Sequence, residues 1–262
     1  KTIKEGGAVY DIVSGLQSGV ANVADSLMAL KTLVFERQVL TAAQVRDALT
    51  ADFLNPGGEL VRRQLLRAPK YGNDIAEVDG LAARVLNDYL DEAKKYHNTR
   101  YGHGPIGGGY AGSTSNISAN VPLGASVGAT PDGRRAGEPI AEGVSPVHGC
   151  DTGGPTKVLR SVARLPNIKS IAQLLNLRLL PGSLETEEGL RRLAAFLKGF
   201  RNLKIWHVQF NTVSTETLLE AQKFPEKYRD LVVRVAGYSA LFVTLDRATQ
   251  DDIIRRTSHQ LN

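Results

Sequence analysis

Any cysteine chemistry in this chain rests on one residue, Cys150. A thiolate is a nucleophile, and a protonated His148 two residues earlier in the sequence would favour that form. One cysteine cannot form an internal disulfide, nor a zinc or iron–sulfur site built from several thiolates. Of the remaining interpretations, a nucleophile and a structural thiol, we favour the structural thiol, because neighbours in sequence need not be partners in space.

Histidine offers a second candidate chemistry. The spacing of the five histidines matches neither H-E-x-x-H nor a facial triad, so we expect no metal site. One of them lies in the apolar run 205–210, where strand alternation would place His207, Gln209 and Asn211 on one polar face. This face is either catalytic or the surroundings of a hydrogen-bonded core histidine.

Glycine marks three further segments. Residues 102–107 (GHGPIG) fit G-x-G-x-x-G, but they follow a charged helical segment instead of a strand, so we interpret them as a loop and not as a dinucleotide site. Residues 130–135 (TPDGRR) are typical of a tight turn. Gly237 interrupts the apolar, β-prone run 232–242, where it indicates a bulge or a close backbone approach.

The elements that position these residues follow from hydrophobic periodicity and turn signals. Helices are expected at 22–36, 41–53, 59–66, 74–97, 184–201, 215–229 and 248–258. The Gly- and Pro-rich segment 101–155 predicts loops and short strands, and the apolar runs 170–180, 204–213 and 231–242 predict buried strands. Alternating strands and helices predict an α/β sheet or barrel with parallel strands.

Composition narrows the class of protein. The 262 residues are 42% hydrophobic and 23% charged, and the net charge of +5 is spread along the chain, so we expect neither a disordered chain nor a nucleic-acid partner. The sequence contains neither an apolar run of about 18 residues nor the apolar core of a signal peptide. We therefore expect no membrane association and a cytoplasmic location. Because the chain begins with Lys1 instead of Met, a fragment is plausible.

Several of these motifs together resemble one family. Residues 234–238 (RVAGY) resemble the C-terminal radical loop of the glycyl radical enzymes, the superfamily of pyruvate formate-lyase and the glycerol and choline lyases. Other segments are similar to family motifs in the same order: 19–27, 130–137 (TPDGRRAG), 149–156, 207–211 (HVQFN) and 225–230. The resemblance covers nearly the whole chain.

The resemblance implies a fold and a radical site. The fold is α/β, the C-terminal part of a ten-stranded α/β barrel with N-terminal helices, with residues 1–130 in the pyruvate formate-lyase-like catalytic domain and 131–262 in the glycine radical domain. Gly237 is the implied radical site, supported by Arg234, Ala236 and Tyr238, and its apolar neighbours fit a buried, water-excluded position. No cofactor is bound; a separate radical-SAM activating enzyme installs the radical.

The family's thiyl cysteine lies upstream in a Gly-Cys-x-Glu loop that this sequence lacks, so we do not assign that role to Cys150. The chain then resembles the last third of a longer anaerobic lyase that cleaves a C–O, C–N, C–S or C–C bond of a small molecule and forms a homo-oligomer. Alternatives are an arylacetate decarboxylase, a hydrocarbon succinate synthase, a formate acetyltransferase and a stand-alone glycyl-radical subunit without catalysis of its own.

By the same resemblance, two segments contribute to a substrate wall. The implied wall positions are Ser115, Ile117, Ala119, Leu175 and Asn176. Because Ile117 and Leu175 are apolar and offer a hydroxyl no partner, they favour a bulky or aromatic substrate over a small polyol.

Overall fold

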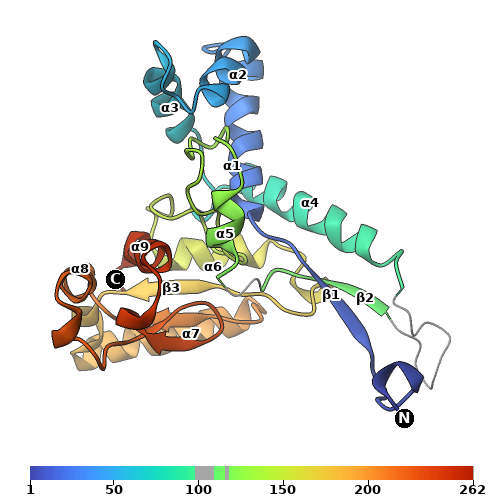
Figure 1. The fold of residues 1–262 in the computed structure, drawn as a ribbon, viewed down its shortest axis with the longest axis vertical. Helices are drawn as coiled ribbons and strands as arrows, with labels where there is room; N and C mark the ends of the chain where they lie inside the picture. The colour runs from blue at the N-terminus through green and yellow to red at the C-terminus, as the bar shows by residue number, and fades with distance from the viewer. Residues whose placement is uncertain (98–108, 116–117, 262) are drawn as a thin grey trace.

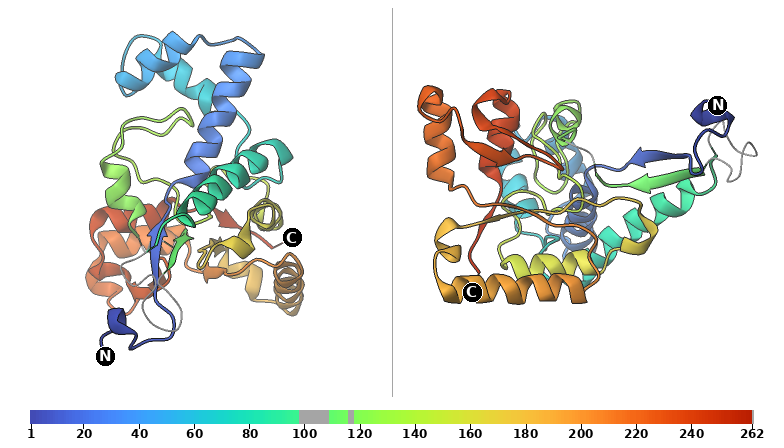
Figure 2. Two further views of the ribbon diagram at one scale, coloured as in Figure 1. Left: turned by 90° about the vertical axis from the view of Figure 1, so that its right-hand side faces the viewer. Right: turned by 90° about the horizontal axis from the view of Figure 1, so that it is seen from below.

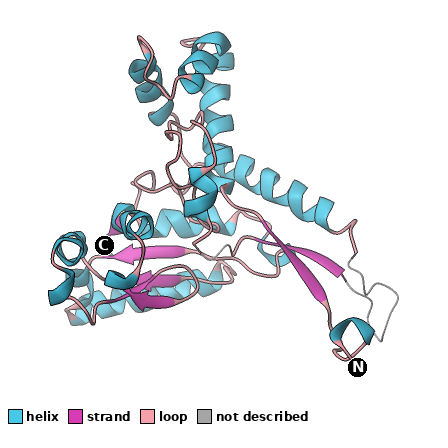
Figure 3. Cartoon of the chain, in the orientation of Figure 1, coloured by secondary structure: helices cyan, strands magenta, loops and turns pink. Residues whose placement is uncertain are grey.

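The computed structural model describes residues 1–97, 109–115 and 118–261 (Figure 1). Three arms meet near the middle of the molecule: a helical arm, an arm that carries the N-terminus, and a mixed arm that carries the C-terminal half. Figure 3 shows that helices make up the first arm, whereas strands lie only in the other two. Within the described residues, no helix is both long and apolar enough to cross a membrane.

The N-terminal helices confirm the periodicity of the sequence. They are α1 (Val20–Leu30), which continues into a π-helical segment (Lys31–Glu36), α2 (Ala42–Thr50), α3 (Gly58–Leu66) and α4 (Ala76–Ala93). A capping box begins α2, where the Thr41 hydroxyl accepts from the Gln44 amide at 3.1 Å. Apolar faces of α1 and α4 pack into one core cluster, and α2 and α3 form a second cluster with Phe53 at the tip of the helical arm.

The Gly- and Pro-rich middle of the chain contains more helix than expected. Strand β2 (Gly109–Ser113) pairs in parallel with β1 (Ile12–Leu16), and the two strands extend toward the N-terminus (Figure 2). Two short helices, α5 (Asn120–Ala125) and α6 (Pro155–Ala163), were not expected. Pro155 occupies the first turn of α6, where its missing N–H has no helical partner to lose.

Parallel strands form the centre of the C-terminal half, as the alternation predicts. Strands β3 (Asn176–Leu179), β4 (Gln209–Asn211) and β7 (Ser258–His259) form a sheet in the order β4-β3-β7. The register places Asn176 beside Gln209. Helices α7 (Glu187–Asn202), α8 (Thr215–Lys223) and α9 (Arg247–Arg255) connect or flank these strands. Short 3-10 turns cover Ile3–Glu5, Asn167–Lys169, Pro181–Leu184, Pro225–Lys227 and Phe242–Thr244.

The sequence predicts one buried strand over residues 231–242, whereas the structure forms an antiparallel hairpin there. Its strands are β5 (Val232–Arg234) and β6 (Ser239–Leu241), and we call residues 232–241 the Gly237 hairpin. The chain reverses because Gly237 adopts a left-handed conformation with φ of +80°, which a residue with a side chain rarely adopts. One face of the hairpin packs on α8 and α9 through Val233 and Val235, each 1% exposed. Fully burying such side chains contributes about 1.5–3 kcal/mol each.

Candidate functional site

Gly237 lies at the exposed turn of the hairpin. This corrects the expectation of a buried position for this chain: Val235 and Ala236 are buried, but Gly237, Tyr238 and Ser239 are exposed. A Cβ atom added to Gly237 would meet nothing within 4 Å. Packing therefore does not require glycine here. The left-handed backbone does, and it leaves the α-carbon accessible.

Gln209 of β4 holds the Gly237 amide. Its Oε1 accepts a hydrogen bond from Gly237 N at 3.1 Å and another from Arg234 Nε at 2.9 Å. Gln209 is 6% exposed, so this contact is shielded from water. The peptide group before the Gly237 α-carbon is therefore fixed in orientation by a side chain of the neighbouring sheet.

The predicted polar face of β4 lies against the hairpin. Asn211, on the same face as Gln209, donates from Nδ2 to the Arg234 carbonyl at 3.3 Å. His207 lies two residues before β4 and so outside the strand in which the sequence pattern places it; it is half-buried, and its pKa is lowered by burial and by the charge of Arg234. A lowered pKa means that His207 is neutral at pH 7. The face therefore supports the hairpin through two amide side chains.

The Arg234 side chain links the two strands of the hairpin. Nη1 donates to the Ser239 hydroxyl at 3.0 Å, and Nη2 lies 3.5 Å from the Gly237 carbonyl oxygen. The turn itself is closed by the Val235 amide, which donates to the Tyr238 carbonyl at 2.9 Å. Arg234 and Tyr238 thus contribute directly to the turn geometry, and Ala236 is fully buried beneath it.

The expected wall positions that the structure describes differ in their surroundings. Asn176 donates from Nδ2 to the Val235 carbonyl at 3.4 Å and accepts a hydrogen bond from Gln209 Nε2, so it supports the hairpin. Leu175 has no exposed surface and belongs to the main hydrophobic core. Ser115 and Ala119 are half-buried near the start of α5, and Ile117 lies outside the described residues. Because the Leu175 side chain lies in the core, its apolar character does not favour a bulky substrate over a small one.

Cys150 has no activated environment. Burial raises the pKa of its thiol to about 12, and the nearby charge of Asp25 adds to the shift. His148 does not offset this: its Nδ1 lies 3.6 Å from Asp252 Oδ1. The hypothesis that His148 favours a Cys150 thiolate is therefore wrong, and the structural interpretation fits the geometry.

The 130–135 segment is a tight turn, as its residues predict. Asp132 and Arg134 are buried, and Asp132 Oδ2 accepts from Asn22 Nδ2 of α1 at 2.6 Å. Gly133 adopts φ of +98°. The turn therefore connects α1 with the loops of the middle segment and shows no contact with the Gly237 hairpin.

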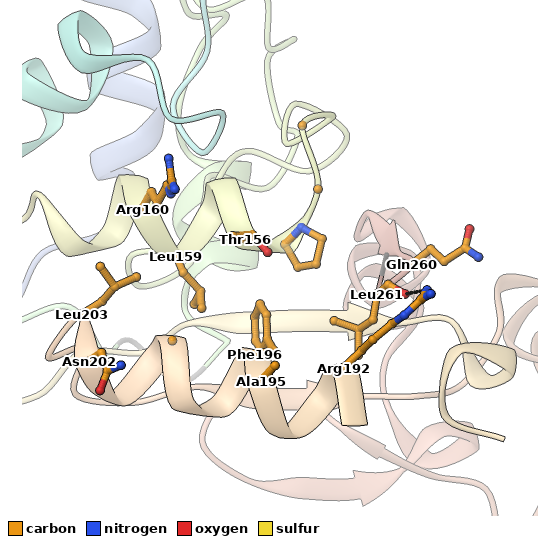
Figure 4. Close-up of a pocket in the computed structure, with 14 residues that line it drawn as sticks. Thr156, Leu159, Arg160, Arg192, Ala195, Phe196, Asn202, Leu203, Gln260 and Leu261 are labelled. Carbon is orange, nitrogen blue, oxygen red and sulfur yellow. Dashed lines mark hydrogen bonds between the residues drawn. The ribbon is translucent and has the colours of Figure 1, made fainter. Parts of the chain in front are cut away.

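A groove of about 560 Å³ lies between α6 and α7 (Figure 4). Leu159, Phe196 and Leu203 give it an apolar floor, and Arg160 and Arg192 flank it. Neither Gly237 nor the side chains that hold it contribute to this groove, so it is separate from the hairpin site. Within the part of the chain that the structure describes, no group of three His, Cys, Asp or Glu side chains could hold a metal ion.

Sequence reasoning does not single out Arg256, although it contacts the hairpin. Its Nη1 donates to the Arg234 carbonyl at 3.2 Å. Arg256 directly follows α9, and a basic residue at a helix C-terminus is ordinary in any sequence. Only the tertiary arrangement brings it to the hairpin.

Comparison with known families identifies both halves of the chain. Residues 1–124 match the family model described as pyruvate formate lyase-like, and residues 140–243, which include Gly237, match the model described as glycine radical. This chain belongs to the glycyl radical enzyme family. The boundary expected at residue 130 falls between the two matched ranges.

Relatives of this glycyl radical enzyme chain are lyases and dehydratases. A protein of Escherichia coli (strain K12) named "Probable dehydratase YbiW" is 53% identical over 264 residues, covering 100% of this chain and 33% of that protein. An isethionate sulfite-lyase of Oleidesulfovibrio alaskensis is 40% identical over 251 residues, covering 92% of this chain and 28% of that protein.

The fold is shared with solved glycyl radical enzymes. The glycerol-bound, B12-independent glycerol dehydratase from Clostridium butyricum matches with a TM-score of 0.93 at 43% identity, covering 99% of this chain and 32% of that one. The chain therefore has the α/β fold of this family and forms part of the barrel. It spans about a third of the length of the relatives it matches.

Proposed function

We propose that Gly237 stores an organic radical within a longer, anaerobic glycyl radical lyase. A radical at a glycine α-carbon is delocalised over the flanking amide nitrogen and carbonyl, and no side chain twists or shields it. The observation that carries the proposal is a left-handed glycine with a fixed amide inside the segment that matches the glycine radical model: the Gly237 N–H is bonded to the buried Gln209.

Installation of the radical requires access to Gly237. An activating enzyme of the radical-SAM class would remove one hydrogen atom from the α-carbon, which breaks one C–H bond and leaves one unpaired electron there. Within the residues that the structure describes, no atom blocks the turn, because a Cβ added to Gly237 would meet none of them within 4 Å. Arg234 and Asn176, bonded to the hairpin, would hold its shape after the hydrogen is lost.

Transfer of the radical uses a cysteine outside this chain. The Gly237 radical would take a hydrogen atom from that thiol, and the resulting thiyl would take one from the substrate. The product radical would take a hydrogen atom back from the thiol, and the thiyl so regenerated would take one from Gly237, so the cycle has no net oxidation. Cys150 is a poor candidate for this thiol, since its hydrogen-bonded neighbours are Val147 and Asn73 and not the hairpin.

For the reaction, we propose dehydration of a hydroxylated small molecule, that is, cleavage of a C–O bond. The support is similarity: a protein named as a probable dehydratase at 53% identity and a glycerol dehydratase structure at 43%. C–S cleavage, named for the 40% identical isethionate sulfite-lyase, is the next reaction to test. An activating enzyme and the substrate are thus the proposed partners, with a homo-oligomer as the proposed assembly.

The test is turnover by the full-length protein after anaerobic activation. Glycerol, a 1,2-diol, isethionate and an arylacetate would be supplied separately, and we expect a diol or glycerol to yield an aldehyde and water. Gly237→Ala should abolish turnover. Gly149→Ala is the matched control, because Gly149 has φ of +79° and equally open surroundings. Turnover in Gly237→Ala, or activity on isethionate or the arylacetate alone, would contradict the proposal.

A further inference from the structure

The strand end that leads into the Gly237 turn is held at one carbonyl oxygen by two donors. Arg234 O accepts from Asn211 Nδ2 at 3.3 Å and from Arg256 Nη1 at 3.2 Å. Arg234 is the last residue of β5, three residues before Gly237. Whatever fixes this oxygen therefore fixes the point from which the turn departs.

Arg256 is buried and charge-compensated. It is 7% exposed, and its Nη2 lies 3.3 Å from both Glu142 Oε2 and Asp252 Oδ2. Those carboxylates are 1% and 2% exposed. A guanidinium is a planar fork of donors, so one side chain can contact the carboxylates and the hairpin carbonyl together. Lysine has a single ammonium and cannot reproduce this geometry.

Residues from distant parts of the chain hold the surroundings of Arg256 in place. Asp252 Oδ1 accepts from Asn120 Nδ2 of α5 at 3.1 Å. Arg178 of β3 donates to the carbonyls of Ile253 at 3.3 Å and Ile254 at 3.2 Å, and also to that of Arg256 itself. The backbone and the side chain of Arg256 are therefore both fixed by the fold.

We infer that Arg256 is a positioning residue for the radical loop. It acts through Arg234 O, which it holds so that the Gly237 amide meets Gln209. This inference rests on the proposed function for its consequence in radical storage. The mechanical part, that Arg256 sets the order of the hairpin, stands on the contacts alone.

Amide hydrogen exchange of the full-length protein tests the mechanical part without activation. We expect Arg256→Met to raise the exchange rate of peptides covering 231–242 at least tenfold, and Arg256→Lys to raise it less. Peptides from α4 should not change in either variant. The control is Arg247→Met, which removes a 68% exposed arginine from α9, the helix that Arg256 follows, and should leave both regions unchanged.

Electron paramagnetic resonance of the activated protein tests the consequence. We expect the glycyl signal of Arg256→Met to decay several-fold faster than that of the wild type and Arg247→Met. Unchanged exchange at 231–242 in a folded Arg256→Met variant would overturn the inference. Equal acceleration in α4 and the hairpin in both Arg256 variants would also overturn it, because the role would then be general stability. Absence of any signal in the wild type would refute radical storage instead, while exchange would still decide the anchoring role.

Discussion

Two glycine turns in this chain share a backbone conformation but differ in their surroundings. Gly133 and Gly237 have φ of +98° and +80°, both in the left-handed region. A Cβ on Gly133 would lie 2.7 Å from Cγ and Cδ2 of Leu66, whereas a Cβ on Gly237 would meet nothing within 4 Å. The first turn is closed by packing, and the second is open at its α-carbon.

An arginine supports each turn, and the two arginines differ in the same way. Arg134 is 5% exposed and donates to the backbone carbonyls of Val127, Arg135 and Glu138 at 3.2, 3.0 and 2.6 Å. Arg234 is half-buried and donates mainly to side chains. The closed turn is thus part of the scaffold, while the open turn is attached to the scaffold by a few side-chain hydrogen bonds.

The largest difference should appear when the arginines are exchanged for methionine. Arg134→Met removes the hydrogen bonds of a buried guanidinium to the carbonyls of Val127, Arg135 and Glu138, so we expect the free energy of unfolding to fall by about 3 kcal/mol. Arg234→Met should lower it by about 1 kcal/mol, because the Arg234 side chain is only half-buried and one of its partners, Ser239, is exposed. Denaturant titration of the full-length variants measures both. Equal losses would refute the contrast between a structural turn and an attached one.

A buried carboxyl beneath the closed turn should make that region pH-dependent. Asp25 is fully buried, and burial raises its pKa to about 7, with the charge of Lys70 opposing the shift. The folded chain then retains a proton that the unfolded chain releases near pH 3.9. This stabilisation is complete below about pH 4 and is lost as the pH rises toward 7.

Asp25→Asn isolates this effect, because it keeps the oxygen that accepts from the Tyr71 amide at 2.7 Å. We expect the stability of the wild type relative to Asp25→Asn to fall by about 2 kcal/mol between pH 5 and pH 7.5. Exchange at the Gly237 hairpin should not follow this titration. A pH-independent difference between the two proteins would show that Asp25 is ionised throughout.

The smallest expected difference comes from the glycines themselves. Gly133→Ala adds a steric clash to left-handed strain and should cost about 2 kcal/mol. Gly237→Ala adds only the strain and should cost about 1 kcal/mol. Thermal unfolding of both variants beside the wild type measures the difference. A Gly237→Ala variant less stable than Gly133→Ala would mean that the open turn is closed in the full-length protein.

Sequence patterns predict the regular parts of this fold better than its hairpin. Helices α1 to α4 have continuous apolar faces that fix their period, and the parallel β3 and β4 follow from alternation with helices. Residues 231–242 are mostly apolar and β-prone, so only the left-handed Gly237 distinguishes a hairpin from one strand. The sequence does not predict helix α5, because it contains Pro122 and Gly124 and lies in the segment whose composition predicts loops.

The residues of the candidate site also differ in how well the sequence predicts them. Gly237 is found from its motif, and Gln209 and Asn211 from strand alternation, because both signals are local. Arg256 contacts the hairpin from the segment between α9 and β7, and Asn176 contacts it from β3. Contacts between segments that are distant in sequence leave no local pattern in either segment. The exposure of Gly237 in this chain has a related cause. Apolar neighbours predict burial, but in a hairpin they pack one face against the core and leave the turn exposed.

Electron paramagnetic resonance of the activated full-length protein tests the central claim most directly. A radical at Gly237 retains one α-hydrogen, so the account predicts a doublet that collapses to a single line when the protein is labelled with glycine deuterated at the α-carbon. Gly149→Ala should keep the doublet, and Gly237→Ala should lose it. The same doublet in a folded Gly237→Ala variant would contradict the account.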